Sequence, residues 1–460
     1  MSTSSLGTSR PKSTTFSEKF EEVTFSAIRN VLPDETIVRA CRESGYLYRE
    51  RKITPILTVL HMLLAAIWPE DSFQASWCVI WENFVSHFPH RRGQCPSRSS
   101  VAEARARVPI EAWERIFTWI RQKAQEHSAP FDRWRDHRVV LVDGTCVSMA
   151  DQPDLKKAFG VNTGRHGAGR YPLARVVTLC LAGTRVILNY AIGRYKQSEM
   201  ALACPLLDQL QQGDLLLADR HFAGAHYYVG YQRQGLEFLT RAHQRLKISN
   251  IKPLCQYTVD DFVGKLNINK KYRRADPSLP ASLPVRFVRA NLRIRGRRQV
   301  VWFATSLLAA ERYPASELVG LYAQRWRIET LLREVKIDLS ADVLRSQTPS
   351  GIRKEMIARL TALNVVRTLM LQAAQAGDVD PLRISLVETL RTILSFSPVL
   401  ASAPLLALPE LHRAMLTEIA AHARPERPGR LEPRYLTRER KHYPALRRQT
   451  RAQWRARHAA

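Results

Sequence analysis

The stretch RVVLVDGTCVSMA, residues 138–150, decides which fold this sequence predicts. Its Val and Leu residues follow one another without the alternation of a half-exposed strand, which is the pattern of a central strand buried on both faces. Two further strands are predicted over ARVVTLCLAG (174–183) and TRVILNYAIGRY (184–195), separated by a Gly turn. The region therefore begins with three consecutive strands.

Alternating helices and strands follow these three. A helix is predicted over 198–210, a strand over 214–222, a second helix over 223–235 and a strand over 236–242. The order βββαβαβ predicts a ribonuclease-H-like sheet in a multi-domain α/β protein. In such a sheet the first and fourth strands are neighbours, so residues at their ends lie close together.

The rest of the chain divides by composition into flanking segments around the two parts of this core. We expect a flexible leader (1–17), a helical N-terminal DNA-binding domain (18–130), the first part of the core (135–245), a β-rich insertion (246–305), the second part of the core (306–345), a helical C-terminal region that contributes to dimerisation (346–423) and a basic tail (424–460).

Charge indicates the partner. Lys and Arg outnumber Asp and Glu by 70 to 42, a formal net charge of +28, which favours a polyanion and first of all double-stranded DNA. The apolar run ILTVLHMLLAAIW (56–68) is too short to span a bilayer, and the N-terminus lacks an apolar signal core. Seven scattered Cys suggest neither a disulfide framework nor a zinc site. We expect a soluble cytoplasmic protein associated with the nucleoid.

The stretch YAQRWRIETLLREVK, residues 322–336, is predicted to be a helix with its chemistry on one side. Arg327, Thr330 and Glu334 are expected to face water, and a solvated run of charges is the ordinary alternative for the whole helix. At about 100° per residue, four functional side chains share one narrow stripe: Tyr322, Arg325, Glu329 and Lys336.

Two Asp residues end or interrupt short apolar strands, Asp143 in VVLVDGT and Asp219 in LLLADRHF. An Asp there is costly unless it is paired, protonated or bound to a metal, although a turn before Gly144 and a helix N-cap are the ordinary alternatives. Neighbouring strands would bring Asp143 and Asp219 together, and the later helix would bring Glu329 against them. Three clustered carboxylates predict two Mg²⁺ ions, for which Mn²⁺ can substitute, about 3.5–4 Å apart.

The spacing of the stripe resembles the Y-(2)-R-(3)-E-(6)-K signature of DDE transposases of the bacterial insertion-sequence family four. LVDGT and ADRHF look like the blocks around that family's first and second Asp, and the likeness runs from about residue 50 to 345. The resemblance implies a ribonuclease-H-like core with a β-rich insertion between Asp219 and Glu329. It also implies cut-and-paste transposition in a synaptic dimer on terminal inverted repeats, through nicking, a hairpin, hairpin resolution and strand transfer.

The remaining candidate residues are DNA contacts. Arg325 and Lys336 are expected to neutralise phosphates and Tyr322 to donate a hydrogen bond to one. Trp302, in VVWFATS, is similar to a Trp that relatives keep for stacking on a flipped base, with an ordinary strand-core Trp as the alternative. Arg220 is expected either to touch phosphate or to brace its loop.

A short basic helix precedes the core. Ser100 and Glu103 fit a capping box and Pro109 fits the first position of the next helix. Arg105 and Arg107 on this short helix are candidate contacts of a recognition helix, and an ordinary basic amphipathic helix is an equal alternative.

Two other functions remain open. A structure-selective nuclease would use the same carboxylates but needs neither Lys336 in register nor Trp302. A retired transposase kept as a DNA-binding protein would be expected to lose its carboxylates, and all three are present.

Overall fold

The computed structural model of the chain describes most residues between Ser26 and Pro425. In numbers, these are 26–48, 53–68, 73–74, 76–78, 81, 95–164, 167–294 and 297–425. The expected leader and nearly all of the expected tail lie outside the described residues, as does part of the expected helical N-terminal domain. The elements below belong to the compact unit that ends at Arg424.

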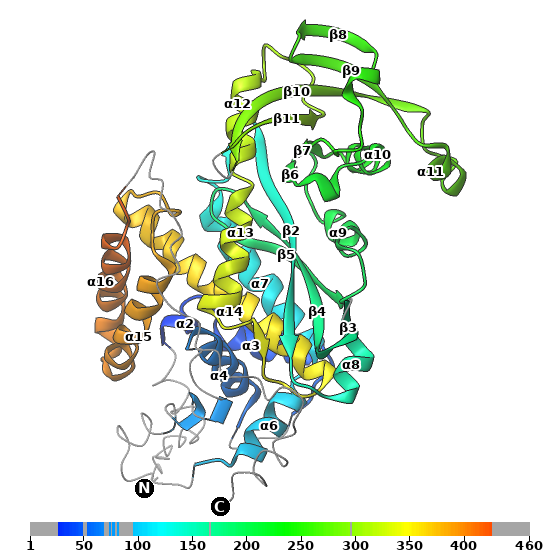
Figure 1. The fold of residues 1–460 in the computed structure, drawn as a ribbon. Coiled ribbons are helices and arrows are strands. Elements are labelled where there is room, and N and C mark those ends of the chain that lie inside the picture. Colours follow the sequence, from blue (N-terminus) through cyan, green and yellow to red (C-terminus); the bar gives the residue numbers. More distant parts are fainter. Residues whose placement is uncertain are drawn as a thin grey trace, which may run out of the picture. The chain divides into compact units, whose positions relative to one another are not determined.

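The core sheet has the predicted strand order (Figure 1). The first three strands are antiparallel neighbours, and the fourth and fifth run parallel to the first, so the order across the sheet is β5-β4-β2-β6-β7. The prediction that the first and fourth strands are adjacent is therefore confirmed. These strands are β2 (His137–Met149), β4 (Gly167–Leu181), β5 (Ile187–Arg194), β6 (Leu215–Ala218) and β7 (Glu237–Arg241).

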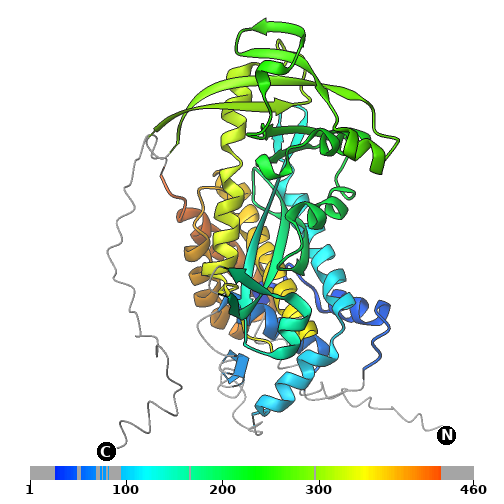
Figure 2. The ribbon, with the colours of Figure 1, turned by 45° about the vertical axis from the view of Figure 1, so that its right-hand side comes forward.

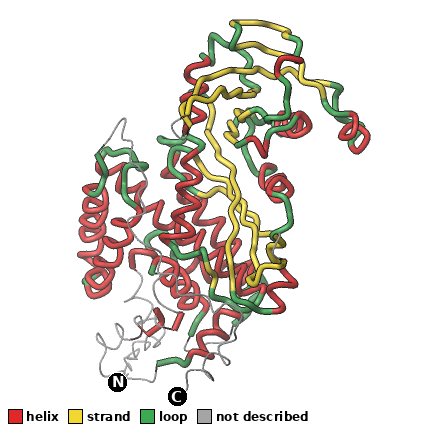
Figure 3. The backbone as a smooth tube through the Cα atoms, viewed as in Figure 1, coloured by secondary structure: helices red, strands yellow, loops and turns green. Residues whose placement is uncertain are grey.

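The insertion extends the core sheet instead of forming a separate one (Figure 3). Its last strand pairs with β7, where Phe303 lies opposite Arg241 and Thr305 opposite Leu239. The prediction of a β-rich segment is confirmed. The insertion consists of β8 (Pro253–Thr258), β9 (Asp261–Asn267), α11 (Lys270–Ala275), β10 (Ser282–Ile294) and β11 (Arg297–Thr305).

Helices cover both faces of the core sheet because successive strand residues point to opposite sides. Leu141 of β2 packs with α7 (Ile110–Ser128), α13 (Trp326–Arg333) and α14 (Pro349–Gly377). Its neighbour Val142 packs with α9 and α10 on the other face. Figure 2 shows α12 and α13 following one another along one side of the sheet. The elements newly named are α9 (Glu199–Leu207), α10 (Ala225–Arg233) and α12 (Ala315–Ala323).

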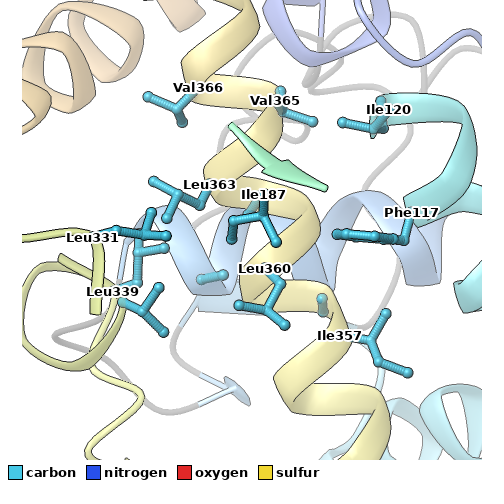
Figure 4. Packing of buried hydrophobic residues seen from close by; sticks show 14 of the residues in the cluster. Phe117, Ile120, Ile187, Leu331, Leu339, Ile357, Leu360, Leu363, Val365 and Val366 are labelled. Carbon is cyan, nitrogen blue, oxygen red and sulfur yellow. The ribbon is translucent and has the colours of Figure 1, made fainter. Parts of the chain in front are cut away.

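The long helix α14 is the centre of the helical layer. Its side chains contact Phe117 of α7 on one side and approach Leu331 of α13 on the other (Figure 4). The buried side chain of Asn364 accepts a hydrogen bond from the Ile187 N–H at 2.9 Å and donates one to the Ile187 carbonyl at 2.9 Å. Because both groups belong to one residue of β5, this pair fixes the position of α14 against the sheet.

The remaining elements include one helix and one strand between β2 and β4 that the sequence did not predict. None of the helices in the described ranges is long and apolar enough to cross a bilayer. These elements are α2 (Ser26–Arg29), α3 (Asp34–Glu43), α4 (Pro55–Ile67), α6 (Arg98–Arg107), β1 (Arg133–Trp134), α8 (Pro153–Phe159), β3 (Val161–Gly164), β12 (Val343–Leu344), α15 (Leu386–Ser402) and α16 (Leu408–Ala421).

The starts of α6 and α7 correct two predictions. Ser97 is the N-cap of α6, since its hydroxyl accepts from the Ser100 N–H at 3.3 Å, so the predicted box of Ser100 and Glu103 is wrong. Pro109 is the N-cap of α7 rather than its first helical residue. The serine run offers several caps, and the helix uses the first of them.

Candidate active site on two neighbouring parallel strands

Asp143, inside β2, and Asp219, directly after the end of β6, belong to neighbouring parallel strands. β2 and β6 pair from Val139 opposite Leu215 to Leu141 opposite Leu217, and continuing this register places Asp143 level with Asp219. The alternative of a turn at Asp143 is wrong, because β2 continues to Met149.

Each of these two carboxylates is oriented by a nearby backbone N–H. Asp143 Oδ1 accepts from the Gly144 N–H at 2.8 Å. Asp219 caps the 3₁₀ turn that follows β6, accepting at 2.7 Å from the His221 N–H, and its Oδ2 lies 2.8 Å from His221 Nδ1. Asp219 is therefore an N-cap, as the alternative interpretation expected. It also lies beside Asp143.

The two carboxylates repel each other in the absence of a cation. Burial raises the pKa of Asp143 to about 6, and the charges of Asp219 and Glu199 act in the same direction. The Gly144 N–H and Arg325 oppose this rise. A group with such a pKa holds its negative charge at a cost, which a bound cation would remove.

Replacing Asp143 by Asn should stabilise the metal-free protein at neutral pH. The folded-state pKa of Asp143 lies above its ordinary value, so its contribution to stability falls as pH rises from about 4 to about 6. We expect Asp143→Asn to raise the free energy of unfolding by on the order of 2 kcal/mol at pH 7.5 in EDTA and to have no such effect near pH 4. Urea unfolding checks this, with the exposed Asp154→Asn as control; equal effects of both variants would contradict it.

The helix that carries Glu329 is not one straight α-helix. A turn at Gln324 and Arg325 separates α12 from α13, and Glu334–Asp338 form a π-helical segment. A π-helix holds more residues per turn, so the predicted stripe is wrong beyond Arg333. At the start of α13 the predicted neighbours Arg325 and Glu329 do meet: Arg325 donates to Glu329 Oε1 at 2.8 Å.

Arg325 connects Glu329 to the strand carboxylates. Its second terminal nitrogen lies 3.9 Å from Asp143 Oδ2, and its side chain is 10 % exposed. The Glu329 side chain is 44 % exposed. The structure therefore brings Asp143, Arg325 and Glu329 together as a chain of alternating charges.

The π-helical segment changes the surroundings of Lys336 and Glu334. Lys336 Nζ lies 3.1 Å from Asp342 and is not on the stripe of Arg325 and Glu329. Glu334, expected to face water, is buried, and it pairs with Arg185 at 2.8 Å and with Arg367. Burial alone would raise the pKa of Glu334, but the two guanidinium groups lower it below its usual value. The prediction for Glu334 is wrong because two arginines from other elements attract it inward.

Tyr322 and Trp302 lie on different sides of β11. Tyr322 is 8 % exposed and packs on Phe303 with ring centroids 4.7 Å apart, and burial raises its pKa to about 12. Trp302 is partly buried and meets Phe262 edge-on at 6.0 Å. The structure does not place these two candidate DNA contacts side by side.

The other basic candidates have protein partners. Arg220 donates to Gln244 at 3.0 Å, and Arg107 lies 3.7 Å from Glu103 on its own helix. Arg105 stacks over Phe73 at 3.8 Å and lines a cavity of about 830 Å³ between α4, α6 and the start of α14. Arg105 therefore points toward the protein interior, which the helix pattern did not show.

A fourth carboxylate, which the sequence did not reveal, lies beside the pair. Glu199 at the start of α9 accepts from Arg175 at 2.6 Å. A Cβ on Gly144 would lie 2.7 Å from Glu199 Cγ, so the glycine in LVDGT allows this approach. In the sequence, Glu199 appears only as an acidic residue in the first turn of a predicted helix. Acidic residues are common there because they interact favourably with the helix dipole, so this position alone does not indicate a site.

The donor atoms fit a divalent cation by type but are not assembled around one. No three His, Cys, Asp or Glu side chains in the described part of the chain are close enough together to hold a metal ion. Asp143 and Asp219 offer carboxylate oxygens, which Mg²⁺ and Mn²⁺ prefer, whereas Glu329 is paired with Arg325.

This order of strands, with acidic side chains on two neighbouring ones, is the arrangement expected of a DDE-type enzyme that acts on polynucleotides. The sequence model of the family "Transposase DDE domain" matches residues 134–365, half of the chain, and the chain belongs to this family. It is 27 % identical over 346 residues to "Transposase InsG for insertion sequence element IS4" of Escherichia coli K12, covering 74 % of this chain and 76 % of that protein.

A second relative supports the same assignment over a shorter range. The chain is 32 % identical over 143 residues to "Putative transposase InsZ" of Escherichia coli K12, covering 30 % of this chain and 47 % of that protein. The resemblance to the DDE transposases of insertion-sequence family four is thus confirmed.

Proposed function

We propose that this chain cuts DNA at the ends of an insertion sequence and joins those ends to target DNA by a cut-and-paste route. The observation that carries the proposal is the position of Asp143 level with Asp219, with Arg325 linking Asp143 to Glu329. A structural ion-pair network alone does not require two like charges level with each other on neighbouring parallel strands.

The carboxylates Asp143, Asp219 and Glu329 would hold the divalent ions, two per site, with Mg²⁺ or Mn²⁺ as the ion. Such ions activate water or a 3′-OH and stabilise the leaving oxygen. For Glu329 to take part, its hydrogen bond to Arg325 must open, which frees a planar guanidinium for the scissile phosphate. Arg325 thus neutralises carboxylates before DNA binds and phosphate afterwards.

Two further side chains would hold the DNA backbone near this centre. The pKa of Tyr322 is raised to about 12, so its hydroxyl remains protonated and can donate to a phosphate oxygen. Lys336 is 30 % exposed and can exchange Asp342 for phosphate. Arg220, beside Asp219, would brace its loop through Gln244.

End recognition is proposed for α6 together with the segment before α14. Four cationic residues line the cavity of about 830 Å³: Arg98, Arg105, Arg345 and Lys354. Several cations in one cavity suit the phosphates of a DNA duplex. Arg107, on the same helix, would read a base edge once its ion pair with Glu103 opens.

We propose that dimerisation involves α15 and α16, because Leu406, in the segment between these two helices, is 97 % exposed.

The function is tested with duplexes that carry the inverted repeats flanking the gene. Wild-type protein should nick these ends and join them to a second duplex in Mg²⁺ or Mn²⁺, and should do neither in EDTA. Cleavage of branched DNA without regard to end sequence would favour the nuclease alternative. Binding of the ends without cleavage in either ion would favour a DNA-binding relative.

Trp302→Ala should separate hairpin formation from nicking. A hairpin requires the DNA to turn back sharply, which unstacks a base near the break, and one aromatic stack returns about 1–3 kcal/mol. We expect near-normal first-strand nicking but an accumulation of nicked ends, which a denaturing gel of end-labelled DNA would show. An abasic site at the flipped position should partly relieve the loss.

Tyr257→Ala is the control, because Tyr257 is an exposed aromatic residue of the insertion. It should leave the ratio of hairpins to nicks unchanged. If Trp302→Ala formed hairpins at the wild-type rate, the base-stacking role would be wrong. Trp302 would then serve only to pack against Phe262.

A further inference from the structure

A second cavity, of about 300 Å³, lies against the face of α13 that was expected to face water. Thr330 of α13, Ser385 before α15 and the end of the unit at Arg424 contribute to its wall. Two carboxylates, Glu334 and Asp338, also line it. Its most frequent lining residue is arginine: Arg185, Arg327, Arg333, Arg383 and Arg424.

The two carboxylates are already committed to nearby arginines. Glu334 pairs with Arg185 at 2.8 Å and with Arg367 behind the cavity wall. Asp338 lies 3.5 Å from Arg333. Among the described residues, these carboxylates therefore form their ion pairs with Arg185, Arg367 and Arg333 and with no other arginine of the wall.

Three guanidinium groups of the wall form no ion pair with any residue that the structure describes. Arg327 donates to the Ala182 carbonyl at 2.9 Å, Arg383 to the Arg424 carbonyl at 2.8 Å, and Arg424 to the Ser385 hydroxyl at 3.0 Å. All three acceptors are neutral. The five arginines and two carboxylates thus give the cavity an excess of three positive charges.

The start of α15 adds to this positive field. Ser385 is its N-cap and Leu386 and Val387 are its first residues, and all three line the cavity. The first N–H groups of a helix have no partner inside the helix, and the dipole of this 17-residue helix places partial positive charge there.

Burial makes the excess charge costly. Arg185 is 7 % exposed, and burial, then the charge of Arg367, lower its pKa to about 10. Burial also lowers the pKa of Arg327, while Asp380 opposes this. Half-buried cations in excess of their counterions favour an added anion, which would neutralise them.

We propose that this cavity binds an oxyanion of the phosphate type. Guanidinium forks from Arg327, Arg383 and Arg424 match tetrahedral oxyanions with paired hydrogen bonds, and a helix N-terminus favours the same charge. The anion is either free phosphate or a phosphodiester of DNA that passes along the back of α13. The site is separate from the carboxylates of the active site, since none of its residues contacts Asp143 or Asp219.

The test compares Arg383→Gln/Arg424→Gln with a control of equal charge, Arg391→Gln/Arg413→Gln, whose residues lie on α15 and α16 outside the cavity wall. Melting temperatures are measured in sodium phosphate and in sodium chloride of equal ionic strength. Phosphate should stabilise the wild type and the control, and its apparent Kd should rise about tenfold or more in the cavity variant. Arg327→Gln provides an independent variant should the double substitution fail to fold.

A second measurement distinguishes the two sources of the anion. If it is a DNA phosphate, the slope of log K against log salt for a short duplex should fall by about 0.9 for each lost contact in the cavity variant, beyond the change in the control. An unchanged slope with lost phosphate stabilisation identifies a free-anion site. Equal phosphate stabilisation and equal slopes in the cavity variants and the control would overturn the proposal, whatever the result of the DNA cleavage assay.

Discussion

Asp143→Asn, Asp219→Asn and Glu329→Gln should each lower the rate of DNA strand cleavage about a thousandfold or more. When residues act as one catalytic unit, losing any one of them removes most of the rate enhancement of the whole unit. Each change removes a negative charge and almost no volume. DNA affinity should stay within about threefold, since most of it comes from Lys and Arg contacts to phosphate. Single-turnover nicking of end-labelled duplexes measures the first effect and a filter-binding or mobility-shift titration the second.

Matched substitutions guard against a trivial loss of structure. Glu317→Gln lies on α12, where Glu317 pairs with Arg135 at the surface, and it should cleave like the wild type. Asp143→Asn should be the more stable protein at neutral pH, so its inactivity cannot come from unfolding. Wild-type nicking in Mg²⁺ by any one of the three carboxylate variants would remove that residue from the site.

Glu334→Gln should strongly destabilise the folded protein. It removes the shared counterion of Arg185 and Arg367, both of which are buried. Breaking a buried pair from one side costs about 3–5 kcal/mol, because it leaves charges without a partner in a medium of low polarity. We expect the urea midpoint to fall accordingly, while the surface variant Glu388→Gln, which loses only an exposed pair with Arg391, should stay close to the wild type.

The pH dependence of this effect has a definite sign. The pKa of Glu334 is lowered in the folded protein, so its contribution is present at neutral pH and is lost as pH falls below about 4.3, toward the folded-state pKa. The difference between wild type and Glu334→Gln should therefore shrink in acid. Adding Arg185→Gln to Glu334→Gln should recover part of the loss at pH 7. A constant difference across this pH range would show that packing, not charge, accounts for the effect.

The core was predictable because its signals are local. Uninterrupted Val and Leu runs indicated buried strands, and the order of strands and helices indicated the sheet. Once β2 and β6 were expected to be neighbours, the approach of Asp143 to Asp219 followed, and the observed register places them level. That Arg325 and Glu329 lie on the same side followed from their spacing of four residues, and the structure adds the hydrogen bond between them.

Other features depend on contacts between distant segments. The π-helical segment and the burial of Glu334 depend on Arg185 and Arg367, which no spacing within 322–336 reveals. Glu199 reaches Asp143 only because α9 begins beside Gly144. The basic cavity on the supposed water face of α13 forms only when α15 and Arg424 meet that helix.

The pairing of β11 with β7 limits how this protein could be shortened. Without residues 246–305, β7 would become the edge of the core sheet, and the N–H and C=O groups that now pair with Phe303, Ala304 and Thr305 would be exposed. An open edge beside buried Leu239 is a template for pairing with another chain, and it leads to aggregation. The insertion therefore covers one edge of the core sheet, and we expect a protein without residues 246–305 to aggregate.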